Sequence, residues 1–140
     1  MKKEPIGKLI SEIHRQNQKK LVKMLAPYGI GSGGHHSFLK LILVHPGITQ
    51  DELTQELKFD KATTARSVRQ LEESGYIERK VDDKDRRSHL LFPTPKALEF
   101  EPVLQNILKQ LNIDLTRDLT DEEQALLVSL LKKVSASAFD

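Results

Sequence analysis

The sequence predicts a mainly α-helical fold of six helices with one small β-hairpin. Apolar residues recur at helical spacing along most of the chain, and capping signals mark where several helices begin. One short segment has alternating residues followed by a charged turn and a second apolar stretch, which is typical of a hairpin. A length of 140 residues suits one domain, or one compact unit with dimerising arms.

The composition excludes several classes of protein. With 38% hydrophobic and 30% charged residues it is an ordinary soluble composition, and no apolar run is longer than residues 41–44, whereas a membrane span needs about 20 residues. No apolar leader follows the N-terminus, and there is no cysteine for a disulfide, a thiolate zinc site, an iron–sulfur centre or a redox sensor. We therefore expect a cytoplasmic protein without a membrane partner or a cofactor.

The net charge of +2 is small but unevenly distributed. Residues 1–29 carry seven Lys or Arg against two acids, a net charge of +5, and residues 98–140 carry four against eight, a net charge of −4. We expect the two ends of the chain to attract each other, within one subunit or between two. The alternative is two separately solvated helix faces.

The first part of the chain predicts two helices. The first, from Ile6 to Leu25, has an apolar stripe at each end and a polar run between them, which suits a helix that makes contacts at both ends. The second has Ser32 as its N-cap and runs to about His45. It is apolar on nearly every side, which indicates a buried core helix.

Two short helices follow, joined by a tight turn. A capping box formed by Thr49 and Glu52 opens the first of them, which ends at Leu57. Asp60 caps the second, which spans residues 61–74. This arrangement is typical of a helix-turn-helix.

A β-hairpin is predicted next, with strands over residues 76–81 and 89–93 and a charged tip over residues 82–88. Because proline has no N–H to donate, Pro93 is expected at the end or the edge of its strand. A hairpin directly after a helix-turn-helix is a wing, so the sequence predicts a winged helix-turn-helix.

Two long helices complete the chain. Thr94 caps the first, over residues 95–117, and Pro102 is expected to kink or restart it. A second capping box beginning at Thr120 opens the last, over residues 120–137. Together they carry more apolar surface than one small core can use.

The helix at 61–74 has a surface suited to DNA. At about 100° per residue, Thr64, Val68 and Leu71 fall on one side, and the opposite side is small, hydroxylated and cationic. Small residues let a helix approach base edges, and Thr and Arg can contact phosphates and bases. The alternative is an ordinary solvated helix face. The candidate DNA-binding residues on this helix are Lys61, Ala62, Thr63, Ala65, Arg66, Arg69 and Gln70.

The tip of the hairpin adds three further candidates, Asp85, Arg86 and Arg87. The narrow minor groove of A·T-rich DNA attracts arginine, and Asp83 or Asp85 can hold an arginine in an extended pose. The alternative is a solvated loop whose charges neutralise one another.

The stretch from about Ser32 to Ala97 resembles the winged-helix core of the multiple-antibiotic-resistance-regulator (MarR) family. The similar segments are GITQDEL at 47–53, DKATTAR at 60–66, LEESGYIER at 71–79, DRR at 85–87 and TPK at 94–96. The wing signature of the family places its Asp–Arg pair on Asp85 and Arg87. Pro93 stands where the family usually has Leu, and Ala97 where it usually has Gly.

This resemblance implies a homodimeric transcriptional regulator, usually a repressor, that binds a pseudo-palindromic operator on double-stranded DNA. It places helix 61–74 in the major groove and wing 82–88 in the minor groove, with recognition helices about 34–36 Å apart. The implied organisation is an N-terminal dimerisation helix and loop at 1–31, a winged helix-turn-helix at 32–94 and C-terminal dimerisation helices at 95–140.

Members of this family often sense small aromatic ligands in a cleft between the dimerisation helices and the DNA-binding lobe. The candidate ligand-binding residues here are His14, Arg15, Tyr28, His35, His36 and Phe38. A metal site at the histidine pair is disfavoured, because adjacent histidines point different ways and no nearby ligands complete a tetrahedral set. The alternative is that polar residues here line a dimer interface.

Two other classes of function compete with a DNA-binding regulator. One is a winged helix that binds protein without specific DNA binding. The other is an enzyme, which the sequence disfavours because Ser37 beside His36 has no accompanying acid or oxyanion donors.

Overall fold

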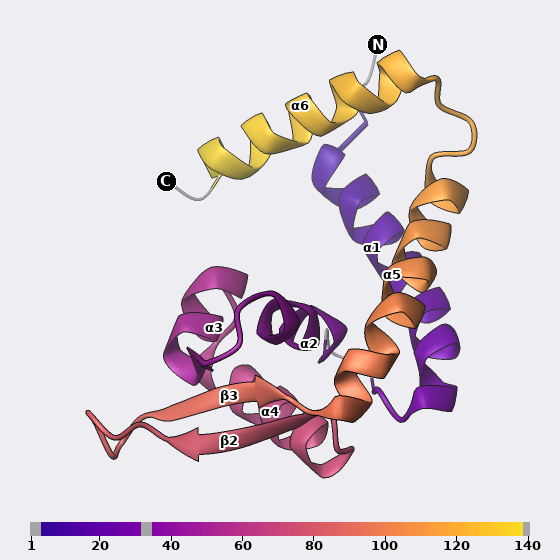
Figure 1. Ribbon diagram of the computed structural model, residues 1–140. Coiled ribbons are helices and arrows are strands. Elements are labelled where there is room, and N and C mark those ends of the chain that lie inside the picture. The colour runs from indigo at the N-terminus through magenta and orange to yellow at the C-terminus, as the bar shows by residue number, and fades with distance from the viewer. Residues whose placement is uncertain (1–3, 32–34, 139–140) are drawn as a thin grey trace. The chain divides into compact units, whose positions relative to one another are not determined.

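The computed structural model describes residues 4–31 and 35–138 (Figure 1). Within this range the chain forms six α-helices and a three-stranded antiparallel sheet, which confirms the predicted fold class. The elements are α1 (Ile6–Leu25), a 3-10 turn η1 (Ala26–Tyr28), α2 (His35–Val44), β1 (Ile48–Thr49), α3 (Gln50–Leu57), α4 (Lys61–Glu73), β2 (Ile77–Val81), β3 (His89–Pro93), α5 (Pro95–Leu115) and α6 (Asp121–Ala138).

The chain divides into two compact units, Met1–Ile107 and Leu108–Asp140, and α5 runs from the first into the second. The first unit contains the helix-turn-helix, the sheet and α1. The second contains the end of α5 and the whole of α6.

Local capping fixes both short helices of the helix-turn-helix. The Glu52 N–H donates to the Thr49 hydroxyl at 3.1 Å, and the Thr49 N–H donates back to the Glu52 carboxylate at 3.3 Å. Asp60 caps α4 by accepting the Thr63 N–H at 2.6 Å. These bonds satisfy N–H groups that a helix start leaves unpaired, so both predicted caps are confirmed.

The core of the first unit lies between α2, α3, α4 and the sheet. Phe38 and Ile42 of α2, Leu53 of α3 and Val68 of α4 are all fully buried. Removing these side chains from water is what holds the short helices together, since each helix alone is too short to be stable.

A chain of hydroxyls also links α3 to α4. Thr64 is fully buried and donates to the Asp60 carbonyl at 3.0 Å, which leaves its oxygen free to accept the Thr54 hydroxyl, also at 3.0 Å. Burying a hydroxyl without hydrogen-bond partners costs free energy. These hydrogen bonds therefore allow a polar contact between the two helices to be buried.

The sheet has the strand order β1–β3–β2. Leu91 of β3 pairs with Ile48 on one side and Arg79 on the other, while Pro93 pairs with Ile77 at the end of the strand, as predicted. Strand β1 was not predicted, because two residues are too few for an alternating pattern. In Figure 1 the β2–β3 hairpin extends beyond α2, α3 and α4 as a projecting wing.

Several predicted boundaries differ from the structure. Helix α2 is described over His35–Val44, so it ends one residue before the predicted His45, and the predicted N-cap Ser32 lies outside the described residues. Helix α4 ends one residue earlier than predicted, where Ser74 is the C-cap and Gly75 takes a φ of 83°, a left-handed conformation that glycine adopts readily.

Of the two expectations at Pro102, a restart of the helix is wrong, because α5 is one helix from Pro95 to Leu115. A kink at Pro102 stays a prediction. Proline removes the hydrogen bond to the carbonyl four residues earlier, that of Leu98. Both Pro102 and Leu98 are exposed, so this carbonyl can be hydrated where the helical donor is missing. The predicted capping box that opens α6 is confirmed, with the Glu123 N–H donating to the Thr120 hydroxyl at 3.1 Å.

Each unit carries exposed apolar side chains. In the first unit they include a stripe on α1 formed by Ile6, Leu9, Ile10 and Ile13, and in the second no residue of α6 is buried. The exposed apolar residues of α6 are Leu126, Leu127, Val128, Leu130, Leu131 and Val134, at 40–59% exposure. Among the described residues, no helix has the length and the continuous apolar character that crossing a bilayer requires.

Candidate nucleic-acid interface

Helix α4 has one buried and one exposed face, divided as the helical spacing predicted. Thr64, Val68 and Leu71 are buried. Of the predicted DNA-binding residues on this helix, Thr63, Ala65 and Gln70 are half-buried, and Lys61, Ala62, Arg66 and Arg69 are exposed. The exposed face is therefore small and cationic, although the role of each residue in DNA binding stays a prediction.

Contacts at the start of α4 orient two of these residues. The Arg66 guanidinium donates to the Thr63 hydroxyl at 3.3 Å, and the Thr63 N–H donates to Asp60. The Thr63 N–H, with the Thr63 hydroxyl acting in the same direction, holds the pKa of Asp60 below its usual value. Thr63 is thus held by a carboxylate that stays charged at neutral pH, and Arg66 is held in turn by the Thr63 hydroxyl.

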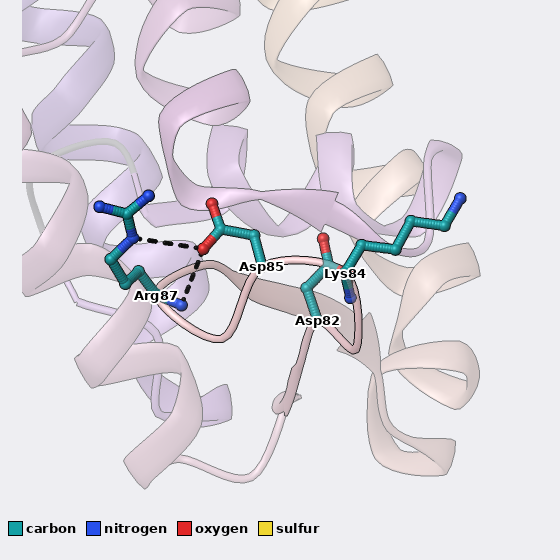
Figure 2. Close-up of polar contacts among 4 residues, drawn as sticks. All are labelled: Asp82, Lys84, Asp85 and Arg87. Atoms are coloured by element: carbon teal, nitrogen blue, oxygen red, sulfur yellow. Dashed lines mark hydrogen bonds and ion pairs between the residues drawn. The ribbon is translucent and has the colours of Figure 1, made fainter.

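A second cationic group lies at the tip of the wing. One carboxylate oxygen of Asp85 accepts the Arg87 N–H at 3.1 Å and the Arg87 Nε–H at 3.4 Å. Figure 2 shows the two terminal guanidinium nitrogens of Arg87 pointing away from Asp85, and the Lys84 side chain extending in another direction. The Arg87 side chain is 94% exposed, so its outer edge is open to a ligand.

The backbone of the tip is held by its own hydrogen bonds. The Asp82 N–H donates to the Ser88 carbonyl at 3.0 Å, and the Ser88 N–H donates to the Asp85 carbonyl at 2.9 Å. The Lys84 N–H donates to the Asp82 carboxylate at 3.0 Å. The sequence left open whether Asp83 or Asp85 orients an arginine, and the structure selects Asp85.

An ion pair that the sequence analysis missed joins α4 to the wing. The Arg79 Nε–H of β2 donates to the Glu72 carboxylate of α4 at 3.1 Å. Its sequence signal is weak, because the two residues are seven apart and the turn between them determines whether they meet. On the same strand, the Lys80 ammonium lies 4.9 Å from the centre of the Phe92 ring.

The predicted ligand-binding residues occupy different environments. His14 and Arg15 are exposed on α1, Tyr28 is exposed at the end of η1, and His35 and His36 are half-buried at the start of α2. Phe38 is fully buried, with its ring 5.1 Å from that of Phe59, so it is a core residue of the first unit.

The histidine pair favours the neutral form. Burial lowers the pKa of His35, and burial followed by the nearby charges of Lys40 and His35 lowers the pKa of His36. Across residues 4–31 and 35–138, no three His, Asp or Glu side chains are grouped in a way that could hold a metal ion.

A cavity of about 430 Å³ lies beside α3, and none of the predicted ligand-binding residues lines it. The residues that line it are His45, Pro46, Gly47, Ile48, Glu52, Gln55 and Glu56. None of them was predicted to bind a ligand.

A family model and a curated relative both match this chain, and both carry the same family name. Residues 29–88 match the family model described as MarR family. The chain is 31% identical over 131 residues to the multiple antibiotic resistance protein MarR of Escherichia coli, a match that covers 93% of this chain and 90% of that protein.

Solved structures extend the similarity to nearly the whole chain. A MarR transcriptional regulator from Methanosarcina mazei superimposes with a TM-score of 0.88 at 36% identity, covering 95% of both chains. A mutant MarR from E. coli complexed with operator DNA superimposes with a TM-score of 0.84 at 29% identity, covering 93% of both chains.

Proposed function

Since this chain belongs to the MarR family of transcriptional regulators, we propose that it acts as a homodimeric repressor of a pseudo-palindromic operator. In this proposal α4 enters the major groove of each half-site and the wing tip enters the adjacent minor groove. Such a protein acts where chromosomal DNA lies, which we expect to be the cytoplasm.

The observation that carries the proposal is the exposed face of α4. Ala62, Arg66 and Arg69 lie opposite the buried Val68, and the acids of this helix, Glu72 and Glu73, are confined to its last turn. A face of this kind can approach base edges closely and place guanidinium groups against guanines or phosphates. The operator complex of the E. coli relative supports DNA as the ligand.

Exposed apolar surface supports the homodimer. The apolar stripe of α6, together with that of α1, is larger than a monomeric protein usually leaves in water. We expect the partner to be a second copy of this chain. Residues 1–29 have a net charge of +5 and residues 98–140 a net charge of −4, so two copies can be complementary in charge. A twofold axis would then set two recognition helices about one turn of B-DNA apart.

Response to a small aromatic effector stays a prediction for His14, Arg15, Tyr28, His35 and His36. Tyr28 supports it most directly, because its exposed ring packs 4.9 Å from the ring of Phe100 and offers an aromatic surface beside the start of α5. Phe38 is the weakest member of the set, because it has no exposed surface.

The proposal is tested by measuring fluorescence anisotropy with DNA from upstream of the protein's own gene and with scrambled DNA. Arg66→Ala is expected to weaken operator binding by about tenfold to a hundredfold, which corresponds to about 1–3 kcal/mol for one base-reading arginine. Binding to scrambled DNA should change much less, because it depends on phosphate contacts alone.

Arg117→Ala is the matched control, since Arg117 is an exposed arginine paired with Asp114 in the second unit. It should leave operator affinity within about twofold. If the dimeric wild-type protein raises the anisotropy of none of these DNAs at low salt, the proposal is contradicted and a protein-binding winged helix is favoured.

A further inference from the structure

The end of the recognition helix is held by residues from two other segments of the first unit. Helix α4 ends in the turn Ser74–Tyr76, and the carbonyl and hydroxyl groups of this turn bond to the η1 segment on one side and to the start of α5 on the other. The turn is therefore the point at which the DNA-reading helix is fastened to the rest of the unit.

Lys96 of α5 supplies the charge at this point. Its ammonium donates to the Ser74 carbonyl at 2.6 Å and lies 4.5 Å from the centre of the Tyr76 ring. Carbonyls at the end of a helix have no helical donors and carry the negative end of the helix dipole, so a cation there is favourable. The face of an aromatic ring attracts the same cation.

Neighbouring contacts complete the attachment. The Thr94 hydroxyl donates to the Gly75 carbonyl at 2.6 Å, and the Ser74 hydroxyl donates to the Gly29 carbonyl at 3.1 Å. Tyr76 is 2% exposed, and its hydroxyl donates to the Tyr28 carbonyl. Burial raises the pKa of Tyr76, so its hydroxyl keeps the proton that it donates.

We propose that Lys96 is a positioning residue for operator recognition, which clamps the end of α4 to the start of α5. Along the chain, α5 continues from this clamp into the second unit, which carries α6. The clamp therefore sets the angle at which the exposed face of α4 is presented relative to the twofold axis. This inference rests on the proposed function and adds to it a residue that touches neither base nor phosphate.

A direct phosphate contact is the competing role for Lys96, because exposed lysines commonly bind the DNA backbone. The two roles differ in their dependence on salt. A phosphate ligand contributes to binding of every sequence and to the slope of log K against log salt, whereas a positioning residue affects the operator complex alone.

The test compares Lys96→Met, which keeps the length of the stem and removes the ammonium, with Lys96→Arg, which restores a cation. Lys109→Met is the matched control, because Lys109 is an exposed lysine of the same helix. Operator and scrambled-DNA affinities are measured over a salt series, and amide hydrogen exchange is measured in the absence of DNA.

Lys96→Met should weaken operator binding by about fivefold or more, with unchanged binding to scrambled DNA and an unchanged salt slope. The amides of Ser74, Gly75 and Tyr76, which close the end of α4 by donating to Gln70, Glu72 and Leu71, should exchange at least about fivefold faster. Lys96→Arg should recover most of both effects, and Lys109→Met should show neither.

Three outcomes would overturn the inference. A salt slope lower by about one, with equal losses on both DNAs, would make Lys96 a phosphate ligand. A lower melting temperature with unchanged operator affinity of the folded protein would make its role merely structural. Unchanged exchange at Ser74–Tyr76 would show that no clamp exists. If the wild type binds no DNA, the proposed function fails, whereas the exchange measurement still decides whether Lys96 fixes the end of α4.

Discussion

Asp85 places a negative charge at the tip of a hairpin that we propose meets the negatively charged backbone of DNA. By charge alone, its removal should strengthen binding. By geometry, it should weaken binding, because Asp85 holds both the backbone and the guanidinium of Arg87. A preoriented arginine loses less conformational entropy when it binds.

We expect orientation to outweigh charge at this residue. Asp85→Ala should lower operator affinity by about threefold to tenfold, as expected when a long side chain has to be immobilised on binding. Asp85→Asn, which keeps the accepting oxygen, should retain or improve it. Asp83→Ala removes the same charge from the same tip and serves as the control in an anisotropy titration. Stronger binding by Asp85→Ala would show that charge decides.

At the scale of elements, α4 is held at both of its ends as well as along its buried face. Asp60 and Thr63 hold the start, and Lys96 and Thr94 hold the end. The buried Val68 fixes the middle. The helix is therefore presented as a rod with both ends attached, which suits an element that has to enter a groove in one orientation.

The cap at Asp60 should make the stability of this element depend on pH. The pKa of Asp60 is lower in the folded protein than its usual value of 3.8, so its contribution is fully present above that value and is lost as the pH falls through the folded pKa. Asp60→Ala should therefore melt at a lower temperature than the wild type at pH 7, and the two melting curves should converge in acid. A constant difference down to the lowest pH would contradict a charged cap.

Elements defined by local chemistry were predictable from the sequence. Capping boxes depend on residues three positions apart, so those at Thr49 and Thr120 were identified correctly. The outward positions of Arg66 and Arg69 follow from helical periodicity alone. Contacts that depend on how the chain folds back were not predicted, including the pairing of β1 with β3 and the bond from Lys96 to Ser74, residues 22 apart in sequence.

At the scale of the whole molecule, the proposed function needs a dimer, because one first unit would read one half-site and a palindrome has two. The exposed apolar residues of α6 are our candidates for part of that dimer interface. Their burial against a second copy would supply about 25 cal/mol for each Å² removed from water.

A charge in the apolar stripe of α6 should therefore separate the subunits. Leu130→Glu is expected to weaken dimerisation at least about tenfold, since burying an unpaired carboxylate is costly, and to weaken operator binding with it. Ser129→Glu adds the same charge to the same helix outside the Leu127–Leu130–Leu131–Val134 stripe and should leave the dimer intact. Light scattering with size-exclusion chromatography measures both, and an unchanged dimer in Leu130→Glu would place the interface elsewhere.

The short strand β1 supports only part of the wing. It pairs only with Leu90 and Leu91, so β3 has a strand on both sides at these two residues but only β2 beside it from His89 to the tip. A two-stranded hairpin is only marginally stable by itself, whereas a third strand adds stability. We therefore expect the end of the hairpin to deform more easily than its base. In the proposed function, this would let Arg86 and Arg87 follow grooves of different width while α4 keeps its orientation.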